Sequence, residues 1–238
     1  MARAARRIQE SDSARKPRLD AATIIAAGLD VAAGSPSTVL SAKELGIRLG
    51  VDPTAIYRHF RNKSHLMAAL LDELNVRSVA AVTAPPEAWR DRLRQLAEAT
   101  LAEYCAHPSI AVEAMMLTTH GPGELDAIEI MLDAFTRAGL PADEVVRHYA
   151  LLATHILSSA SSIARTRAES RDPRGGEPES EFSPWLEGPL LADPRTHPRI
   201  VELSLPLTTL DDRELYRLGI ESVIQSAERY ARSDDASS

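Results

Sequence analysis

Residues 41–63 read SAKELGIRLGVDPTAIYRHFRNK, and the local signals in this stretch decide the fold. Ser41 and Glu44 form a capping box, in which a hydroxyl and a carboxylate three residues later satisfy free amides at a helix start. Gly50 interrupts the helix that begins there, so we expect it to end at about Leu49.

A second short helix follows immediately. Asp52 supplies an N-cap and Pro53 fits the first helical position, which predicts a helix from Pro53 to about Phe60. Two short helices joined by a tight turn predict a helix-turn-helix, whose second helix enters the major groove of DNA. The apolar residues that can seal this pair against a preceding helix are Leu45, Leu49, Val51, Ile56 and Phe60.

Upstream of this stretch, the sequence predicts one helix and one polar arm. Residues 18–34 form the helix, which ends at Gly34 before Ser35-Pro36 and groups Ile24, Ile25, Gly28 and Val31 near one face. Residues 1–17 mix arginine, serine and charge without apolar periodicity, which predicts a disordered, weakly cationic arm. The predicted DNA-binding domain therefore covers residues 18–63.

Downstream, the sequence predicts a larger helical domain over residues 64–232. It contains a connecting helix, 64–82, a mobile charged loop, 169–181, and a polar tail, 233–238. The other expected helices are 87–106, 110–117, 124–138, 142–168 and 211–232. Hydrophobic residues make up 44% and aromatic residues 4% of the chain, and the apolar share is mostly alanine and leucine, which favours an all-α fold.

Composition also limits the compartment and the chemistry. No stretch approaches the roughly 20 apolar residues of a membrane span, so we expect a soluble, cytoplasmic protein with no membrane partner. The single cysteine, Cys105, has no zinc-finger pattern around it, and the sequence contains no common hydrolase, P-loop or dinucleotide motif. We therefore expect no enzyme activity, no cofactor and no metal.

Charge divides the chain unevenly. Residues 1–77 carry 12 Lys and Arg against 8 Asp and Glu, whereas residues 78–238 carry 15 against 26. DNA phosphates require basic residues, so the basic excess at the N-terminal end favours DNA binding there.

The run from Leu49 to Lys63, with its Tyr-x-His-Phe-x-x-Lys core, resembles the helix-turn-helix signature of the TetR family. The resemblance covers about residues 18–80 and implies a dimeric regulator that binds double-stranded operator DNA and senses a small molecule. It also implies that Tyr57 and His59 contact phosphates and that Lys63 adds a cation, although His59 has packing within the head as an alternative role.

Base reading falls to other positions. The start of the recognition helix can present methyl groups and a hydroxyl to base edges. The best candidates for contacting guanine are Lys43 and Arg58, and a phosphate contact is an equal alternative for Arg58. These expected readers are Lys43, Pro53, Thr54, Ala55 and Arg58. One short helix reads few base pairs, so we expect a homodimer on a palindrome, with recognition helices roughly 34–36 Å apart.

The resemblance places the dimer interface in residues 141–168 and 211–230. The small-residue run 157–162 permits close helix approach there, or it is ordinary core. Where the tetracycline-binding branch carries metal-binding histidines, this chain has Val79 and Ala114, which argues against a magnesium–tetracycline ligand. Candidate pocket residues, each with core packing as the alternative, are Trp89, Leu93, Thr100, Met115, Met116, His120, Phe135, His148 and His155.

These observations together predict a repressor that an unknown small-molecule effector releases from its operator. Ligand binding in the C-terminal domain would move the connecting helix and change the separation of the two DNA-binding heads. The alternative is a TetR-like regulator without small-molecule control, which is governed by a partner protein or acts as an activator.

Overall fold

The computed structural model describes residues 19–34, 39–170 and 190–235, and every element assigned in them is an α-helix. The predicted arm and most of the predicted charged loop lie outside the described residues. The helices are α1 (Ala21–Gly34), α2 (Ala42–Leu49), α3 (Pro53–Ile56), α4 (Lys63–Ala80), α5 (Trp89–Ala106), α6 (Pro108–Ala111), α7 (Pro122–Arg137), α8 (Ala142–Ser170), α9 (Pro198–Glu202), α10 (Ser204–Thr209) and α11 (Asp212–Asp235).

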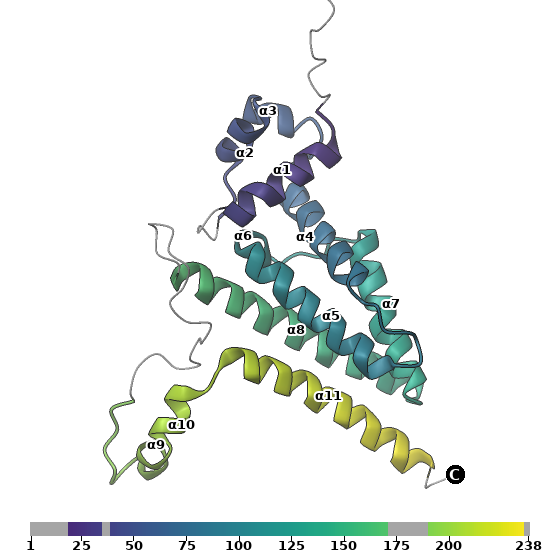
Figure 1. The fold of residues 1–238 in the computed structure, drawn as a ribbon, viewed down its shortest axis with the longest axis vertical. Helices are drawn as coiled ribbons and strands as arrows, with labels where there is room; N and C mark the ends of the chain where they lie inside the picture. Colours follow the sequence, from purple (N-terminus) through teal and green to yellow (C-terminus); the bar gives the residue numbers. More distant parts are fainter. Residues whose placement is uncertain (1–18, 35–38, 171–189, 236–238) are drawn as a thin grey trace, which may run out of the picture.

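The helices form a small head and a larger body. Helices α1, α2 and α3 make the head at one end, and α4 runs from the head into the body (Figure 1). In the body, α4 packs on α5 and α7, while α8 packs on α5, α7 and α11. Helix α4 therefore belongs to both parts, because its N-terminal half also contacts α1.

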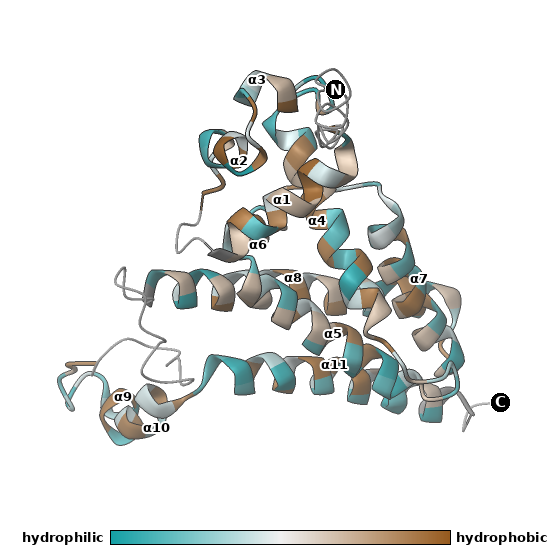
Figure 2. Ribbon diagram, turned by 45° about the horizontal axis from the view of Figure 1, so that its top comes forward, coloured by the Kyte–Doolittle hydropathy of each residue, from teal (hydrophilic) through white to brown (hydrophobic). Residues whose placement is uncertain are grey.

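One hydrophobic cluster runs through both parts. Ile24 in the head and Leu70 and Leu74 on α4 are fully buried, as are Leu93 on α5 and Leu152 on α8. The side of α11 that faces away from α5 and α8 is mostly hydrophilic (Figure 2), which is the pattern of an amphipathic surface helix.

Two glycines allow α4 to approach its neighbours closely. A Cβ at Gly28 on α1 would lie 2.8 Å from Cδ2 of Leu70. A Cβ at Gly123 on α7 would lie 2.4 Å from the backbone oxygen of Asp72 and 2.7 Å from the backbone nitrogen of Val76. Backbone atoms cannot move aside as a leucine methyl can, so α7 tolerates no side chain at Gly123 in this packing.

Several predicted bounds were wrong. The recognition helix ends at Ile56 instead of about Phe60, and residues 57–60 continue as hydrogen-bonded turns. The helix expected at 110–117 is α6, which begins at Pro108 because proline fits a first helical position, and ends at Ala111.

The remaining corrections concern the second half of the chain. Helix α8 extends to Ser170, so the first two residues of the expected loop are helical. Helices α9 and α10 were not expected. The last helix runs from Asp212 to Asp235, slightly beyond the predicted 211–232.

Candidate DNA interface and ligand pocket

Gly50 forms the turn between α2 and α3. Its φ of 66° and ψ of 33° lie in the left-handed region, which glycine adopts without steric cost. Its N–H donates back to Ile47, and the N–H of Val51 donates to the carbonyl of Gly46 at 3.0 Å. These bonds satisfy carbonyls at the end of α2, so the chain reverses directly into the next helix.

Asp52 caps α3. Its Oδ1 accepts hydrogen bonds from the N–H of Thr54 at 2.8 Å and from the Thr54 hydroxyl at 2.6 Å. The hydrogen bond from the Thr54 hydroxyl, and to a smaller extent the one from the Thr54 amide, stabilise the ionised form. They lower the pKa of Asp52 below its ordinary 3.8. Because Asp52 already holds the hydroxyl proton of Thr54, the hydroxyl can only accept from a base, and its methyl group stays available.

The head presents most of the expected DNA-contacting side chains to solvent. Pro53 and Ala55 are half-buried, and Tyr57 is 38% exposed. The other expected residues are exposed, namely Lys43, Thr54, Arg58, His59 and Lys63. His59 is thus not packed in the core of the head, which leaves its ring free to approach a phosphate.

The start of α4 is held by residues beside Lys63. The side-chain oxygen of Asn62 caps α4 by accepting from the N–H of His65 at 2.8 Å. The ring of His65 accepts from the N–H of Arg61 at 3.2 Å and meets Phe60 edge-on, with ring centroids 5.6 Å apart. Sequence reasoning missed His65, although its place three residues after Asn62 is the spacing of a helix cap.

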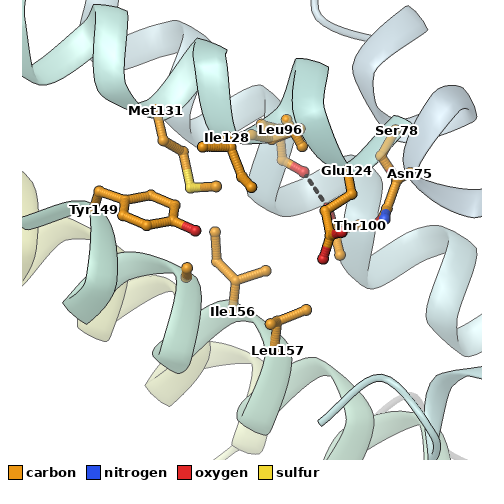
Figure 3. Close-up of a pocket in the computed structure, with 12 residues that line it drawn as sticks. Asn75, Ser78, Leu96, Thr100, Glu124, Ile128, Met131, Tyr149, Ile156 and Leu157 are labelled. Atoms are coloured by element: carbon orange, nitrogen blue, oxygen red, sulfur yellow. Dashed lines mark hydrogen bonds between the residues drawn. The ribbon is translucent and has the colours of Figure 1, made fainter. Parts of the chain in front are cut away.

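A pocket lies within the body between α4, α5, α7 and α8 (Figure 3). It holds about 570 Å³ of empty space, part of which is open to solvent. Its lining is mostly apolar and consists of Asn75, Ser78, Leu96, Thr100, Glu124, Ala127, Ile128, Met131, Tyr149, Ala153, Ile156 and Leu157. A mostly apolar cavity with a few polar groups is typical of a small-molecule site.

The polar groups of this pocket differ in their availability. The hydroxyls of Ser78 and Thr100 donate to carbonyls of their own helices, at 2.9 and 2.8 Å. Oε2 of Glu124 accepts from the N–H of His120 at 2.7 Å. The side chains of Asn75 and Tyr149 have no hydrogen-bond partner among the described residues. They are therefore available to a ligand.

Of the nine pocket candidates named from the sequence, the structure places Thr100 on this pocket's wall. Trp89 instead lines a second, more polar cavity, where the guanidinium of Arg90 lies 4.3 Å from its ring centroid. Leu93 and Phe135 lie in the hydrophobic core, whereas Met115, Met116 and His120 are exposed near the turn before α7.

The two remaining candidates join α8 to α11. The ring of His148 is buried, where it donates to the carbonyl of Glu144 at 2.8 Å and accepts from the Ser226 hydroxyl at 3.3 Å. The ring of His155 donates to the carbonyl of Tyr216 at 2.8 Å and stacks on that tyrosine. Both histidines hold helices together and neither lines the pocket.

Sequence reasoning missed most of the lining. The lining residues follow helical spacing, as in Leu96 and Thr100 on α5 or Ala153, Ile156 and Leu157 on α8. That spacing marks the inward face of each helix. Which part of the face meets space instead of another side chain depends on how four helices pack.

The segments expected to form a dimer interface pack on each other within one chain. Ile220 and Ile224 on α11 are buried against the core, while Leu218 is 60% exposed. On α8, Leu151 is 59% exposed. In the small-residue run 157–162, Ser161 is buried and donates to the carbonyl of Ala111 at 2.8 Å, so part of that run is core.

The part of the chain that the structure describes offers neither a metal site nor a membrane span. Within residues 19–34, 39–170 and 190–235, no three His, Cys, Asp or Glu side chains gather closely enough to hold a metal ion. Among the helices in the same ranges, none combines the length and apolar character of a membrane span.

Family comparison matches both parts of the chain. Residues 24–70 match the model of bacterial regulatory proteins of the tetR family, and residues 83–228 match that of the tetracyclin repressor-like C-terminal domain. A relative, the HTH-type transcriptional repressor DrrR1 of Streptomyces coeruleorubidus, is 26% identical over 157 residues. That match covers 66% of this chain but only 58% of the relative, which is less than two thirds of its length.

Solved structures share the fold. Apo ActR from Streptomyces coelicolor superposes with a TM-score of 0.69 at 19% identity, covering 91% of this chain and 98% of ActR. ActR in complex with actinorhodin gives 0.70 at 19% identity, covering 90% and 98%. A second regulator of S. coelicolor, SCO7222, gives 0.66 at 23% identity, covering 90% and 99%.

Proposed function

The chain belongs to the tetR family of bacterial regulatory proteins, which are DNA-binding transcription factors, and we propose that it is a homodimeric repressor released from a palindromic operator by a small-molecule inducer. The observation that carries this proposal is the position of α4. Its first residue, Lys63, stands in the DNA-binding head, and its residues Asn75 and Ser78 line the pocket. A ligand in the pocket therefore touches the helix that bears the head.

In the proposed complex, α3 enters the major groove. The exposed Lys43 and Arg58, together with Pro53, Thr54 and Ala55 at the start of α3, read bases, while Tyr57, His59 and Lys63 hold phosphates. In this proposal residues 18–63 bind DNA, whereas residues 64–232 bind the small-molecule ligand and form the dimer. The protein would act in the cytoplasm, where the bacterial chromosome lies.

Dimerisation is proposed through α8 and α11. Exposed leucines on both helices, Leu151 and Leu218, support this because a second copy would cover them. A symmetric dimer would present two α3 helices to two half-sites of one operator, which supplies specificity that one short helix lacks.

The role of repressor is supported by the relative DrrR1, a transcriptional repressor. Small-molecule control is supported by the pocket and by ActR, whose structure in complex with actinorhodin shares the fold. The alternative is a regulator of the same family that responds to a partner protein or activates transcription. The mostly apolar pocket, with unpartnered Asn75 and Tyr149, favours small-molecule control.

Fluorescence anisotropy on the DNA upstream of the protein's own gene and on a scrambled duplex, over a salt series, tests the DNA-binding part. We expect specific binding roughly 10³-fold tighter than scrambled DNA, and two chains per operator by sedimentation. Lys63→Ala should reduce the salt slope by about one, because one phosphate contact is lost.

Arg195→Ala, which removes an exposed arginine far along the chain, should leave the slope unchanged. Equal, weak binding to both duplexes would contradict binding at this operator, and a genomic selection for bound fragments would then decide whether the head binds any specific site. Tight binding by single chains would contradict the dimer.

A further inference from the structure

We propose that the pocket selects a lipophilic cation, an apolar molecule whose amine or other positive group binds beside Glu124. This inference rests on the proposed ligand-sensing function and adds the chemical class of the ligand. It follows from the charges of the lining, from the free oxygen of Glu124 and from the opposite wall.

The lining carries an acid and no base. Glu124 is its one carboxylate, and none of its members is lysine, arginine or histidine. Directly behind Glu124, Oδ1 of the buried Asp72 accepts from the backbone N–H of Glu124 at 3.0 Å. Neither carboxylate forms an ion pair among the described residues. The amides at the start of α7 stabilise the charge of Asp72, so Glu124 is the acid whose negative charge faces the mostly apolar cavity and that a ligand cation would neutralise.

The structural role of Glu124 uses one of its oxygens. As the third residue of α7, it accepts through Oε2 from the N–H of His120 at 2.7 Å, much as the third helical residue of a capping box accepts from an amide before the helix. Oε1 has no protein partner in the described part of the chain. The carboxylate thus keeps one oxygen for a charge-assisted hydrogen bond to a ligand.

The opposite wall suits the apolar remainder of such a ligand. Figure 3 shows the Glu124 carboxylate and the Tyr149 hydroxyl directed into the cavity from opposite sides. Between them lie apolar side chains of α7 and α8, including Ile128, Met131 and Ile156. A fused aromatic or alkyl body would pack on these side chains, and the Tyr149 ring adds an electron-rich face. An anionic ligand would meet Glu124 with no basic residue in the lining.

A matched trio of probes on one ring system tests the inference: 1-naphthylmethylamine, 1-naphthylmethanol and 1-naphthoic acid. Their heads are cationic, neutral and anionic at pH 7. Calorimetry with the full chain should show the amine binding roughly tenfold or more tighter than the alcohol, because a hydrogen bond between charged groups is stronger than one to a neutral donor. The acid should bind more weakly than the alcohol.

Glu124→Gln keeps an oxygen for the His120 N–H but removes the charge, so it should bring the amine close to the alcohol. Glu129→Gln, an exposed acid on the same helix, is the matched control and should preserve the preference. The comparison of probes on the unmodified chain stands even if Glu124→Gln fails to fold.

Equal binding of amine and alcohol, a preference for the acid, or no binding by any of the three would overturn the inference. Anisotropy with operator DNA separates it from the proposed function. If the amine binds preferentially but never changes operator affinity, the cation site stands and ligand release fails. If the amine and the alcohol bind equally but both release the DNA, ligand release stands and the cation site fails.

Discussion

The side-chain Oδ1 of Asp72 lies 3.0 Å from the backbone nitrogen of Glu124 and accepts its hydrogen bond. Oδ2 accepts from the N–H of Gly123 at 3.3 Å, and Oδ1 also accepts from the Thr119 hydroxyl at 2.8 Å. A carboxylate on α4 therefore caps the N-terminus of α7, where the helix dipole favours negative charge. The helix that bears the head is joined to a pocket residue by this cap.

Asp72→Ala should lower the free energy of unfolding by about 1–3 kcal/mol, because amides in a buried environment lose their acceptor. Asp72→Asn keeps one acceptor oxygen, so its free energy of unfolding should lie between that of the unmodified chain and that of Asp72→Ala. Urea unfolding followed by circular dichroism measures both. Asp126→Ala, an exposed acid on α7, serves as control, and an equal loss there would contradict a capping role for Asp72.

Gly123→Ala should destabilise by about 1–3 kcal/mol, since the added methyl would meet backbone atoms of α4 at 2.4 and 2.7 Å and force the helices apart. Gly28→Ala is the matched test on the other side of α4. Its methyl meets the end of the Leu70 side chain at 2.8 Å, which can rotate, so we expect less than about 1 kcal/mol of change. Thermal unfolding of both variants would show the difference, and similar melting temperatures would contradict it.

The ion pair of Arg94 and Glu221 ties α5 to α11 and should make stability depend on pH. Two bonds of 2.5 and 2.9 Å join the groups, and the bond from Arg94 lowers the pKa of Glu221 below its ordinary 4.5. Stability from a lowered carboxyl pKa is present above the unfolded value and lost as pH falls through the folded value.

The decrease in the free energy of unfolding caused by Glu221→Gln should accordingly be constant above about pH 5.5 and become smaller as the pH falls below 4.5. It should remain under about 1 kcal/mol, because both side chains are over a third exposed. Urea unfolding at several pH values measures it. The more exposed pair of Arg217 and Glu98 offers the comparison, and Glu98→Gln should cost less. A loss that grows toward low pH would refute the assigned sign.

Ala153→Leu should fill part of the pocket and weaken binding of 1-naphthylmethylamine at least about tenfold, because the ring and the new side chain compete for one space. Ala150→Leu places the same side chain on the exposed face of α8 and should leave binding unchanged. Calorimetry distinguishes the two. Equal affinity in both variants would show that the amine binds elsewhere.

Much of the head was predictable because its signals are local. Ser41 accepts from the N–H of Glu44, α2 ends at Leu49 before Gly50 and Asp52 caps α3, as the spacing of these residues predicted. Local signals did not fix where α3 ends. Tyr57 is compatible with a helix or a turn, and Ile56 and Phe60 on either side of the turn are both buried, so the end of α3 depends on tertiary packing.

The pocket was less predictable because it depends on packing between helices. Thr100 was named, but Asn75, Glu124 and Tyr149 were not, since each would be ordinary on a helix surface. His148 and His155 drew attention by their residue type, whereas their neighbours Ser226 and Tyr216 on α11 give them structural roles. Such partners are more than 60 positions away in sequence, beyond the reach of periodicity.

The length of α4 converts small displacements into large ones. Its 18 residues span about 27 Å, and Asn75 lies about 18 Å from Lys63 along the axis. A rotation of about 5° about the pocket end would swing the head by roughly 2 Å, and two such swings in opposite directions would change the half-site spacing by about 4 Å, close to one base pair. Helix α4 thus has the dimensions of a lever arm, in which a rotation of a few degrees at the pocket becomes a displacement of roughly 2 Å at the head.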